Sequence, residues 1–380
     1  RSQQLDSALL AFPCLYKKIQ RNSITRDASL FLCTLHSLPL FSLPPSSSLP
    51  TTKALFVCFS PGFAKLGFRF DSSENREMAE GVIEHRSYAR VGLLGNPSDV
   101  YFGRTISFSL SNFWATVVLR PSDELVITPH PKHDLVNFSS LDHLVNRLQS
   151  EGYYGGVRLL MAISLNCLLD FYKVRDQIKV EIRPNLVLSA EKELGIVAGL
   201  QDRVAQIYGG LVYMEFSQEH MDKLGHGIYT PMDINLLPPL HLVYAENPSD
   251  SGKVHSTVKQ RWLDGDKFII TTMAEVADLA LHGKTAILEK NYSKLAELMN
   301  RNFDLRRSMF GDDVIGALNI KMVEAARKVG AASKFTGSGG AVIVFCPNGQ
   351  SQVKLLEEEC QKAGFIVEPV KIAQSNLSRG

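Results

Sequence analysis

Apolar residues gather in short runs after residue 78, and these runs predict strands. The first run ends in the turn-forming sequence GNPSD at 95–99, and another turn is expected at 121–123. The residues of the later runs suit a pleated surface. The predicted strands are 91–94, 105–110, 114–119 and 125–128. We therefore expect a sheet of several short strands in this part of the chain.

Helical periodicity follows these runs. An N-cap-like sequence with an acidic first turn begins at Ser139 and predicts a helix at 141–149, and a second pattern predicts a helix at 157–174. The segment 187–211 starts as a helical pattern and breaks at Gly195 and Gly199 before a second apolar run.

The pattern after residue 239 is that of a compact α+β unit. Its predicted elements are a strand at 240–245, helices at 272–283, 291–303 and 312–330, a strand at 341–346, a helix at 351–363 and a strand at 365–372. The order of strand, helices, strand, helix and strand is compatible with a ferredoxin-like sandwich. We therefore expect an N-terminal α/β domain over 78–238 and a C-terminal domain over 239–380.

Composition narrows the class of protein. The chain has 380 residues, of which 45% are hydrophobic, enough for two ordinary domains. A formal charge of +2 does not favour nucleic-acid binding, and no apolar run reaches the roughly 18 residues of a membrane span. The six cysteines show no metal-ligand spacing, which indicates reduced thiols and a cytoplasmic location.

Residues 1–77 differ from the rest, being rich in Ser, Leu, Phe and Pro. The first methionine is Met78, so the segment reads as leader sequence without a fold of its own. A plastid transit peptide and a small folded module are the alternatives.

Polar residues mark three candidate sites. Arg90 and Asp99 bracket a strand-to-loop corner, and carboxylates at Glu191, Glu193 and Asp202 lie on the glycine-interrupted central segment. A glycine-rich turn at 337–340 would let backbone amides approach an anion. His130 and His133 lack further ligands at metal-site spacing and read as surface residues, and Lys253 and His255 at most line the cleft.

Three stretches in this order resemble the motifs of the GHMP kinases: RVGLLGNPSDVYFG at 90–103, AEKELGIVAGLQDRVAQIYGG at 190–210 and KFTGSGGA at 334–341. The wording is most similar to that of the plant glucuronokinases. The resemblance implies a GHMP kinase fold, with an N-terminal domain like domain 2 of ribosomal protein S5. It also implies that ATP phosphorylates the anomeric hydroxyl of D-glucuronate, giving glucuronate 1-phosphate for UDP-glucuronate synthesis.

The same resemblance assigns roles to residues. Asp202 would orient the sugar hydroxyl and Glu191 would bind Mg²⁺, as phosphoryl transfer requires. A positive group should meet the sugar carboxylate, with Arg104, Arg158 and Arg203 as candidates. The resemblance places the sugar among Arg90, Asn96, Ser98, Asp99 and Tyr101, and the phosphates beside Gly337, Ser338, Gly339 and Gly340.

One family feature is missing from the sequence. The second motif of these kinases is a Gly-Ser-rich phosphate loop before a helix, where backbone amides and the helix end hold an anion. Between Met161 and Leu165 this chain passes from one helical pattern into the next without such a loop. The alternatives are therefore an isoform that cannot bind ATP, or a related kinase with another sugar or alcohol as acceptor.

Overall fold

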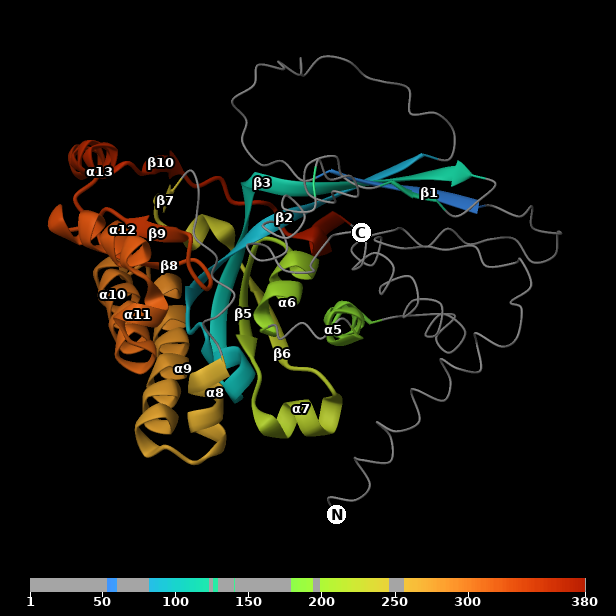
Figure 1. The fold of residues 1–380 in the computed structure, drawn as a ribbon, viewed down its shortest axis with the longest axis horizontal. Coiled ribbons are helices and arrows are strands. Elements are labelled where there is room, and N and C mark those ends of the chain that lie inside the picture. Colours follow the sequence, from blue (N-terminus) through green and yellow to red (C-terminus); the bar gives the residue numbers. More distant parts are fainter. Residues whose placement is uncertain are drawn as a thin grey trace.

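The N-terminal sheet is built around one long strand, β3. Residues 53–59, 82–122, 126–128, 140, 179–193, 199–245 and 256–379 are the part of the chain that this computed structural model describes. β2 runs antiparallel along β3, while β5 pairs with the beginning of β3 and β1 with its end. The sheet has six strands in the order β4-β1-β3-β5-β6, with β2 also on β3 (Figure 1). Its strands are β1 (Lys53–Phe59), β2 (Ile83–Leu94), β3 (Arg104–Ser122), β4 (Val126–Thr128), β5 (Leu211–Glu215) and β6 (Ile228–Met232).

β3 corrects two expectations, because the strands expected at 105–110 and 114–119 are one continuous strand. The residues between them stay extended against the C-terminal tail: the amide of Ser111 donates to the carbonyl of Lys371, and the Asn112 side chain accepts from the amide of Lys371. β2 adapts by a register shift between Tyr88 and Ala89. The turn expected at 121–123 also begins later, since β3 ends at Ser122.

β1 lies inside the segment that was expected to be leader without a fold. That expectation is wrong for Lys53–Phe59, which pair antiparallel with Phe59 opposite Thr116 and Lys53 opposite Ser122. β5 pairs only with the beginning of β3. The backbone groups near the end of β3 form their hydrogen bonds with β1 instead. The rest of 1–77 and the helices expected at 141–149 and 157–174 lie outside the described residues, apart from Ser140.

The second sheet has four antiparallel strands in the order β10-β7-β9-β8. In chain order the unit runs β7, helices, β8, β9, α13 and β10, which is the split β-α-β arrangement of a ferredoxin-like fold and confirms the expected class. The short β8 is the strand that sequence reading missed. The elements are β7 (Leu240–Tyr244), α8 (Ser256–Leu263), α9 (Lys267–Leu288), α10 (Tyr292–Phe310), α11 (Asp312–Ile315), α12 (Ala317–Lys328), β8 (Ala332–Phe335), β9 (Ala341–Phe345), α13 (Gln350–Ala363) and β10 (Ile366–Pro369).

The helix expected at 312–330 is divided into α11 and α12 at Gly316, which has a φ of +87°. Such a left-handed conformation suits glycine and interrupts the helical hydrogen bonds. The helices expected at 272–283 and 291–303 extend further than predicted, because their buried faces continue along α9 and α10.

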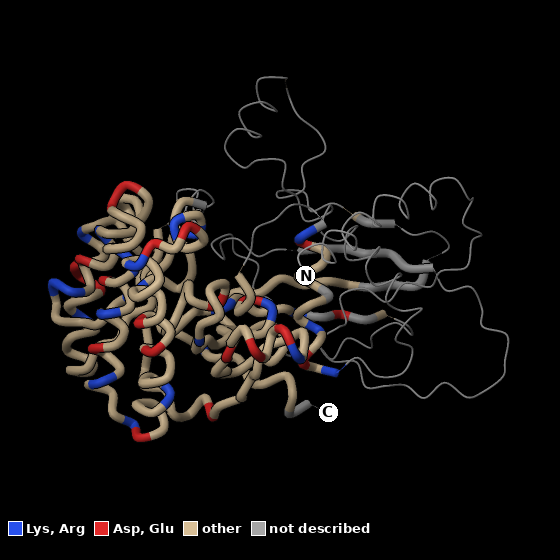
Figure 2. The backbone as a smooth tube through the Cα atoms, turned by 90° about the horizontal axis from the view of Figure 1, so that it is seen from below, with Lys and Arg blue, Asp and Glu red and all other residues tan. Residues whose placement is uncertain are grey.

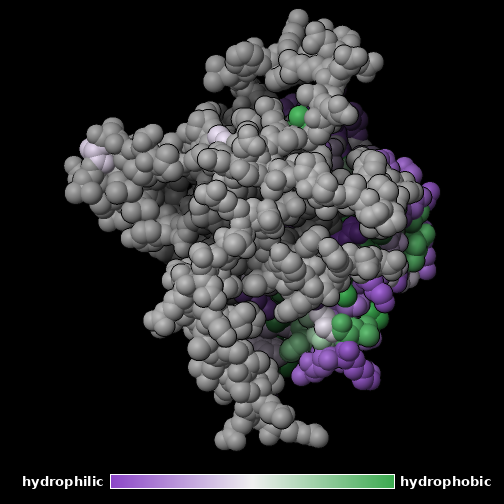
Figure 3. Space-filling view, turned by 90° about the vertical axis from the view of Figure 1, so that its right-hand side faces the viewer, coloured by the Kyte–Doolittle hydropathy of each residue, from purple (hydrophilic) through white to green (hydrophobic). Residues whose placement is uncertain are grey.

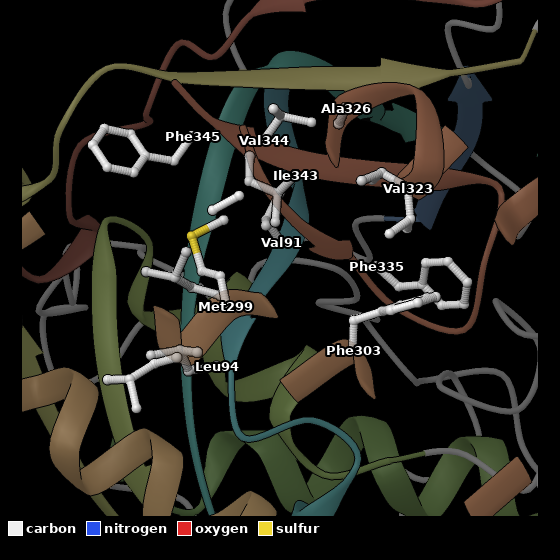
Figure 4. Close-up of a cluster of buried hydrophobic side chains, with 14 of the residues drawn as sticks. Val91, Leu94, Met299, Phe303, Val323, Ala326, Phe335, Ile343, Val344 and Phe345 are labelled. Carbon is white, nitrogen blue, oxygen red and sulfur yellow. The ribbon is translucent and has the colours of Figure 1, made fainter. Parts of the chain in front are cut away.

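One hydrophobic core joins the two sheets. Val91 and Leu94 of β2, Met299 of α10 and Ile343 of β9 belong to the same buried cluster (Figure 4). The rings of Phe303 and Phe335 meet edge to face, with their centroids 5.3 Å apart. The end of β2, which carries the first family-like motif, is therefore fixed against the helices of the C-terminal part.

The remaining described helices are η1 (Ser98–Tyr101), α5 (Arg183–Glu193), α6 (Gln201–Tyr208), α7 (Gln218–Leu224), η2 (Ile234–Leu236) and η3 (Asn376–Arg379). Of these, α6 and α7 lie beside β5 and β6, and α5 lies next to α6 (Figure 1). Positively and negatively charged residues are interspersed along the described backbone (Figure 2), and hydrophobic and hydrophilic residues lie side by side on the described part of the face in Figure 3. No helix within the described ranges combines the length and apolar content needed to cross a membrane.

Candidate active site

Arg90 and Asp202 form an ion pair where β2 ends and α6 begins. Arg90 Nη2 lies 2.5 Å from Asp202 Oδ1, and Arg90 Nη1 donates to the carbonyl of Thr336 at 2.6 Å. One guanidinium therefore links all three family-like motifs. The side chain of Asp202 is 38% exposed, against 13% for Arg90, so the carboxylate stays accessible to a ligand.

Asp99 has the opposite surroundings. Its residue is 2% exposed, and its Oδ2 accepts the backbone amides of Leu200 and Gln201 at 2.6 and 3.1 Å. Burial raises the pKa of Asp99, while the amide donors act against that rise. A methyl group at Gly199 would lie 2.6 Å from Asp99 Oδ2, so the approach requires glycine there. Asp99 thus fixes the helix start next to Asp202.

The other end of α6 is held by the C-terminal tail. The Asn376 amide donates to the carbonyls of Gln206 and Ile207 at 3.1 and 3.2 Å, and the Ser375 hydroxyl donates to the carbonyl of Tyr208. These bonds satisfy carbonyls that a helix end leaves without partners. The short helix that carries Asp202 is therefore anchored at both ends.

Lys334 ties the first motif to the third. Its Nζ donates to the Gly92 carbonyl and Asn96 Oδ1, both at 2.6 Å, and to the Phe335 carbonyl at 2.7 Å. Burial, together with the charges of Arg306 and Arg90, lowers the pKa of Lys334 well below its ordinary value.

The glycine-rich turn begins three residues after Lys334. The carbonyl of Gly337 accepts Arg306 Nη1 at 2.7 Å, and the amide of Gly340 donates to Asn319 Oδ1 at 2.7 Å. A Cβ on Gly339 would come within 2.8 Å of the Asn319 amide, so this turn has no room for a side chain there. The structure thus brings the turn, Arg90 and Asp202 to one place.

Glu191 lies in the last turn of α5 and is paired with Arg203. Burial raises the pKa of Glu191, and the Arg203 charge opposes that rise while Asp202 adds to it. Within the described ranges no three His, Cys, Asp or Glu residues gather into a metal cluster. Mg²⁺ commonly takes only one or two carboxylates together with phosphate oxygens, so the donor chemistry of Glu191 and Asp202 fits this ion.

The other expected site residues support the first motif. Ser98 donates its hydroxyl to the Arg104 carbonyl at 2.9 Å, and Asn96 bonds Lys334. Tyr101 is buried, and its pKa is raised to about 12 by burial and by the negative charge of Asp99. These residues hold the corner in shape.

The three arginines suggested for the sugar carboxylate differ in placement. Arg104 is paired with Glu215 and Asp278, each at 3.2 Å, and Arg203 is paired with Glu191. Arg158 lies outside the described residues, as do His130, His133, Lys253 and His255, and the Glu193 side chain is likewise not described.

Sequence reading missed Arg306 and gave Lys334 and Gln201 no role. Arg306 left a usable signal, because it follows Met299 and Phe303 and precedes Phe310 at helical spacing. An arginine on the apolar face of a helix is a buried charge that needs partners. Its partners lie 31 and 32 residues further along the chain, and only the fold reveals them.

Comparisons with known proteins identify relatives of this chain. The family model described as GHMP kinases C terminal matches residues 284–363. Glucuronokinase 1 of Arabidopsis thaliana is 67% identical over 343 residues, which covers 79% of this chain and 95% of that protein. Probable glucuronokinase 2 of the same plant is 66% identical, with 78% and 93% covered.

Solved structures show the same fold at low identity. The Lin0012 protein of Listeria innocua is 16% identical with a TM-score of 0.57, covering 78% of this chain and 99% of that one. Lactococcus lactis galactokinase, solved with galactose, is 13% identical with a TM-score of 0.51, covering 78% and 95%. Taken with the plant relatives, these matches establish that the chain belongs to the glucuronokinase family of the GHMP kinases.

Proposed function

We propose that this chain transfers the terminal phosphate of ATP to the anomeric hydroxyl of D-glucuronate, giving glucuronate 1-phosphate for UDP-glucuronate synthesis. The observation that carries the proposal is its 67% identity with Glucuronokinase 1, across 95% of that protein. The contact of Arg90 with Asp202, beside the turn at 337–340, supports it with a site of suitable chemistry.

Asp202 is the group that we assign to the sugar hydroxyl. In the reaction an anomeric oxygen–phosphorus bond forms, the bond between the terminal phosphorus and its bridging oxygen breaks, and ADP leaves. The hydroxyl proton passes to the Asp202 carboxylate and then to solvent. Since a carboxylate is a weak base, its main contribution is orientation, with proton acceptance late in the transfer. Arg90 keeps that carboxylate in place.

Mg²⁺ belongs to the proposal as the second cofactor, with Glu191 as the residue that would hold it. When bound, the ion neutralises charge on the phosphate oxygens. Arg203 forms an ion pair with Glu191 in this structure, so metal binding would compete with that ion pair. A binding titration with Mg²⁺ and ATP on the Glu191→Gln variant tests this assignment, which expects weaker metal-dependent nucleotide binding.

An isoform that cannot bind ATP is the second candidate, and one observation favours it. The match to Glucuronokinase 1 runs over 343 residues, but 79% of a 380-residue chain is about 300 residues. About 43 positions of the match therefore have no residue in this chain, and this supports the proposal that the phosphate loop is missing.

A sugar panel separates these possibilities. The full chain is assayed for ADP release with D-glucuronate, D-galacturonate, D-glucose and D-galactose, in the presence of Mg²⁺ and ATP. Release with D-glucuronate well above the other sugars is the expected result. A clear preference for another sugar would reject the glucuronate assignment. Absence of turnover together with absence of ATP binding in calorimetry would favour the inactive isoform.

A further inference from the structure

Three consecutive carbonyls, those of Thr336 and of the first two residues of the glycine-rich turn, point at the half-buried Arg90 and the buried Arg306. The Thr336 carbonyl accepts Arg90 Nη1 at 2.6 Å, the Gly337 carbonyl accepts Arg306 Nη1 at 2.7 Å, and the Ser338 carbonyl faces Arg306 Nη2 at 3.4 Å. The amide of Gly92 also donates to Thr336 at 2.7 Å. The orientation of these peptide groups is therefore set by cations behind the turn.

Because the peptide bond is planar, the direction of each carbonyl also fixes the direction of the N–H group in the same peptide unit. In a trans peptide the N–H points opposite to the C=O of the same unit. With the carbonyls of 336–338 directed at the arginines, the N–H groups of Gly337, Ser338 and Gly339 are directed away from them. In the described part of the chain, the amides of Gly337 and Gly339 donate to no protein group. Successive N–H groups on one side of a turn form a concave site for an anion.

Arg306 is suited to hold this arrangement. It comes from α10, is 2% exposed and lies over the rings of Phe310 and Phe335, each centroid 5.4 Å from its guanidinium carbon. Burial lowers its pKa to about 10, so it remains a cation at neutral pH. Its planar guanidinium can donate hydrogen bonds to two neighbouring carbonyls at once, which an ammonium group cannot do with the same geometry.

The charge of Arg306 is not neutralised by a carboxylate. Its hydrogen-bond partners among the described residues are the carbonyls of Gly337 and Ser338, and Lys334 likewise bonds carbonyls and the Asn96 amide oxygen. A buried guanidinium whose printed hydrogen bonds go to carbonyls therefore lies behind the turn. Its field attracts a negative group placed on the other side of the peptides.

We propose that Arg306 is a positioning residue, which fixes the peptides of 336–339 so that their N–H groups receive a phosphoryl group of ATP or of the phosphorylated sugar. Naming a phosphoryl ligand rests on the proposed function, whereas the orientation of the peptides by Arg306 does not. Arg306 acts through the turn and contacts no ligand itself.

The test uses the full chain with Arg306→Met, Arg306→Lys and the control Arg307→Met. Arg307 is the next residue on α10, and its partner is the exposed Asp312, so the control removes a guanidinium without touching the turn. Calorimetry measures the dissociation constants of ATP, glucuronate 1-phosphate and glucuronate. Crystal structures of the full chain and of Arg306→Met report the peptide orientations, and circular dichroism reports the melting temperature.

Arg306→Met is expected to weaken the phosphoryl ligand that uses the turn by about 10- to 100-fold, the factor of one charged hydrogen bond. Glucuronate should stay within about twofold, and at least one peptide of 336–339 should turn over in the crystal. Arg306→Lys should keep part of the affinity that Arg306→Met loses. Arg307→Met should bind the phosphoryl ligand as tightly as the unsubstituted chain does. The ligand that weakens identifies the source of the phosphoryl group.

Equal weakening of glucuronate and of the phosphoryl ligands would overturn the inference, as would unchanged affinity. Failure of the proposed function would look different, since the unsubstituted chain itself would then bind no ATP. In that case the crystal structures decide: peptides 336–339 that keep their orientation in Arg306→Met would refute the positioning role.

Discussion

Asp99 and Asp202 lie near the same helix end and have opposite surroundings. Asp99 is 2% exposed, and its carboxylate is taken up by the amides that begin α6. Asp202 is 38% exposed at its side chain and is held by Arg90. A carboxylate that is fully engaged inside the protein supports structure, whereas one that is accessible and held beside an arginine can receive a substrate hydroxyl.

Replacing Asp202 by Asn should lower turnover sharply and leave the fold intact. The amide keeps the size of the side chain but cannot accept the hydroxyl proton, so kcat should fall about 10²- to 10⁴-fold, with sugar affinity within a few fold. Steady-state kinetics with a melting curve measure both quantities. Asp222→Asn on the exposed face of α7 is the matched control. Activity within tenfold of the unsubstituted chain would exclude Asp202 as the acting carboxylate.

The raised pKa of Glu191 predicts how the stability of the folded protein depends on pH. Folding raises its pKa, chiefly through burial, so the folded state holds this proton more tightly than the unfolded chain does. The stability that it contributes is complete below the ordinary value of 4.5 and is lost as the pH rises through the raised pKa. Each whole pH unit between the two pKa values corresponds to about 1.4 kcal/mol.

Urea unfolding between pH 4 and pH 7 tests this, with Glu191→Gln as the variant that cannot titrate. Relative to Glu191→Gln, the unsubstituted chain should lose stability as the pH rises across that window. Glu219→Gln, at an exposed glutamate paired with Lys223, should show no such trend. A difference between chain and variant that stays constant with pH would contradict the raised pKa.

At the residue scale, what the sequence could predict depended on where the partners lie. The closeness of Arg90, Asp202 and the turn at 337–340 follows from the family resemblance. The burial of Asp99 does not, because the amides that it accepts lie 101 and 102 residues further along the chain. Some residues between Glu191 and Arg203 lie outside the described part of the chain. The spacing of these two residues in the sequence did not predict their ion pair.

The packing of α9 on the N-terminal sheet depends on a helix glycine. A Cβ at Gly283 would lie 2.1 Å from Leu94 Cδ1, and Leu94 is fully buried. Gly283→Ala should gain up to about 1 kcal/mol from helix propensity, but overpacking costs about 1–3 kcal/mol, so a net loss of stability is expected. Chemical unfolding of the single variant measures the balance.

A double-mutant cycle isolates the contact. Leu94→Val removes the group that the new methyl would meet and by itself should cost about 1 kcal/mol. Combined with Gly283→Ala it should cost less than the sum of the two single changes, by about 1 kcal/mol or more. Strict additivity would mean that α9 shifts away from β2 without strain.

The C-terminal tail is expected to stabilise α6. Asn376→Ala removes two hydrogen bonds to carbonyls at the end of this helix, and about 1–2 kcal/mol of stability should be lost. Because α6 carries Asp202, kcat should fall as well. Gln374→Ala is the control from the same tail, at an exposed side chain. Unfolding curves measure the stability of both variants. If Asn376→Ala is as stable as Gln374→Ala, the tail does not anchor the helix.

Elements with strong periodicity were predicted and those defined by tertiary contacts were not. α9, α10 and α13 follow an apolar stripe, β7 is a mainly apolar run and β9 a continuous one, so all five were expected. β8 has the mixed sequence ASKF and becomes a strand because β9 lies beside it. β3 was divided in two because the tail that holds Ser111 extended is distant in sequence.

The whole molecule places its chemistry at the junction of two sheets that share one core. Val91 and Leu94 anchor the first motif in that core, and Phe335 anchors the third. The ferredoxin-like strand order was predictable because its elements follow one another along the chain. The join between the sheets was not, since it depends on contacts such as Lys334 with Gly92, 242 residues apart.

Nucleotide affinity should depend on a segment that this chain lacks. The chain supplies Asp202, Arg90 and the turn at 337–340, but its sequence has no Gly-Ser-rich loop near residues 161–165. Such a loop binds phosphates through backbone amides at a helix start, an interaction that side chains elsewhere do not replace. Inserting the corresponding segment of Glucuronokinase 1 between Met161 and Leu165 should therefore bring ATP binding into the micromolar range, about 100-fold tighter than in the unsubstituted chain.

Calorimetry with Mg²⁺ and ATP compares the two proteins, and Asp202→Asn is introduced into the chimera as a control. That variant should bind ATP as the chimera does and show no turnover, which separates the nucleotide half of the site from the half that holds the sugar hydroxyl. Equal ATP affinity with and without the inserted segment would show that the loop is dispensable. The turn at 337–340, whose peptides are held by Arg306, would then be the principal phosphate site.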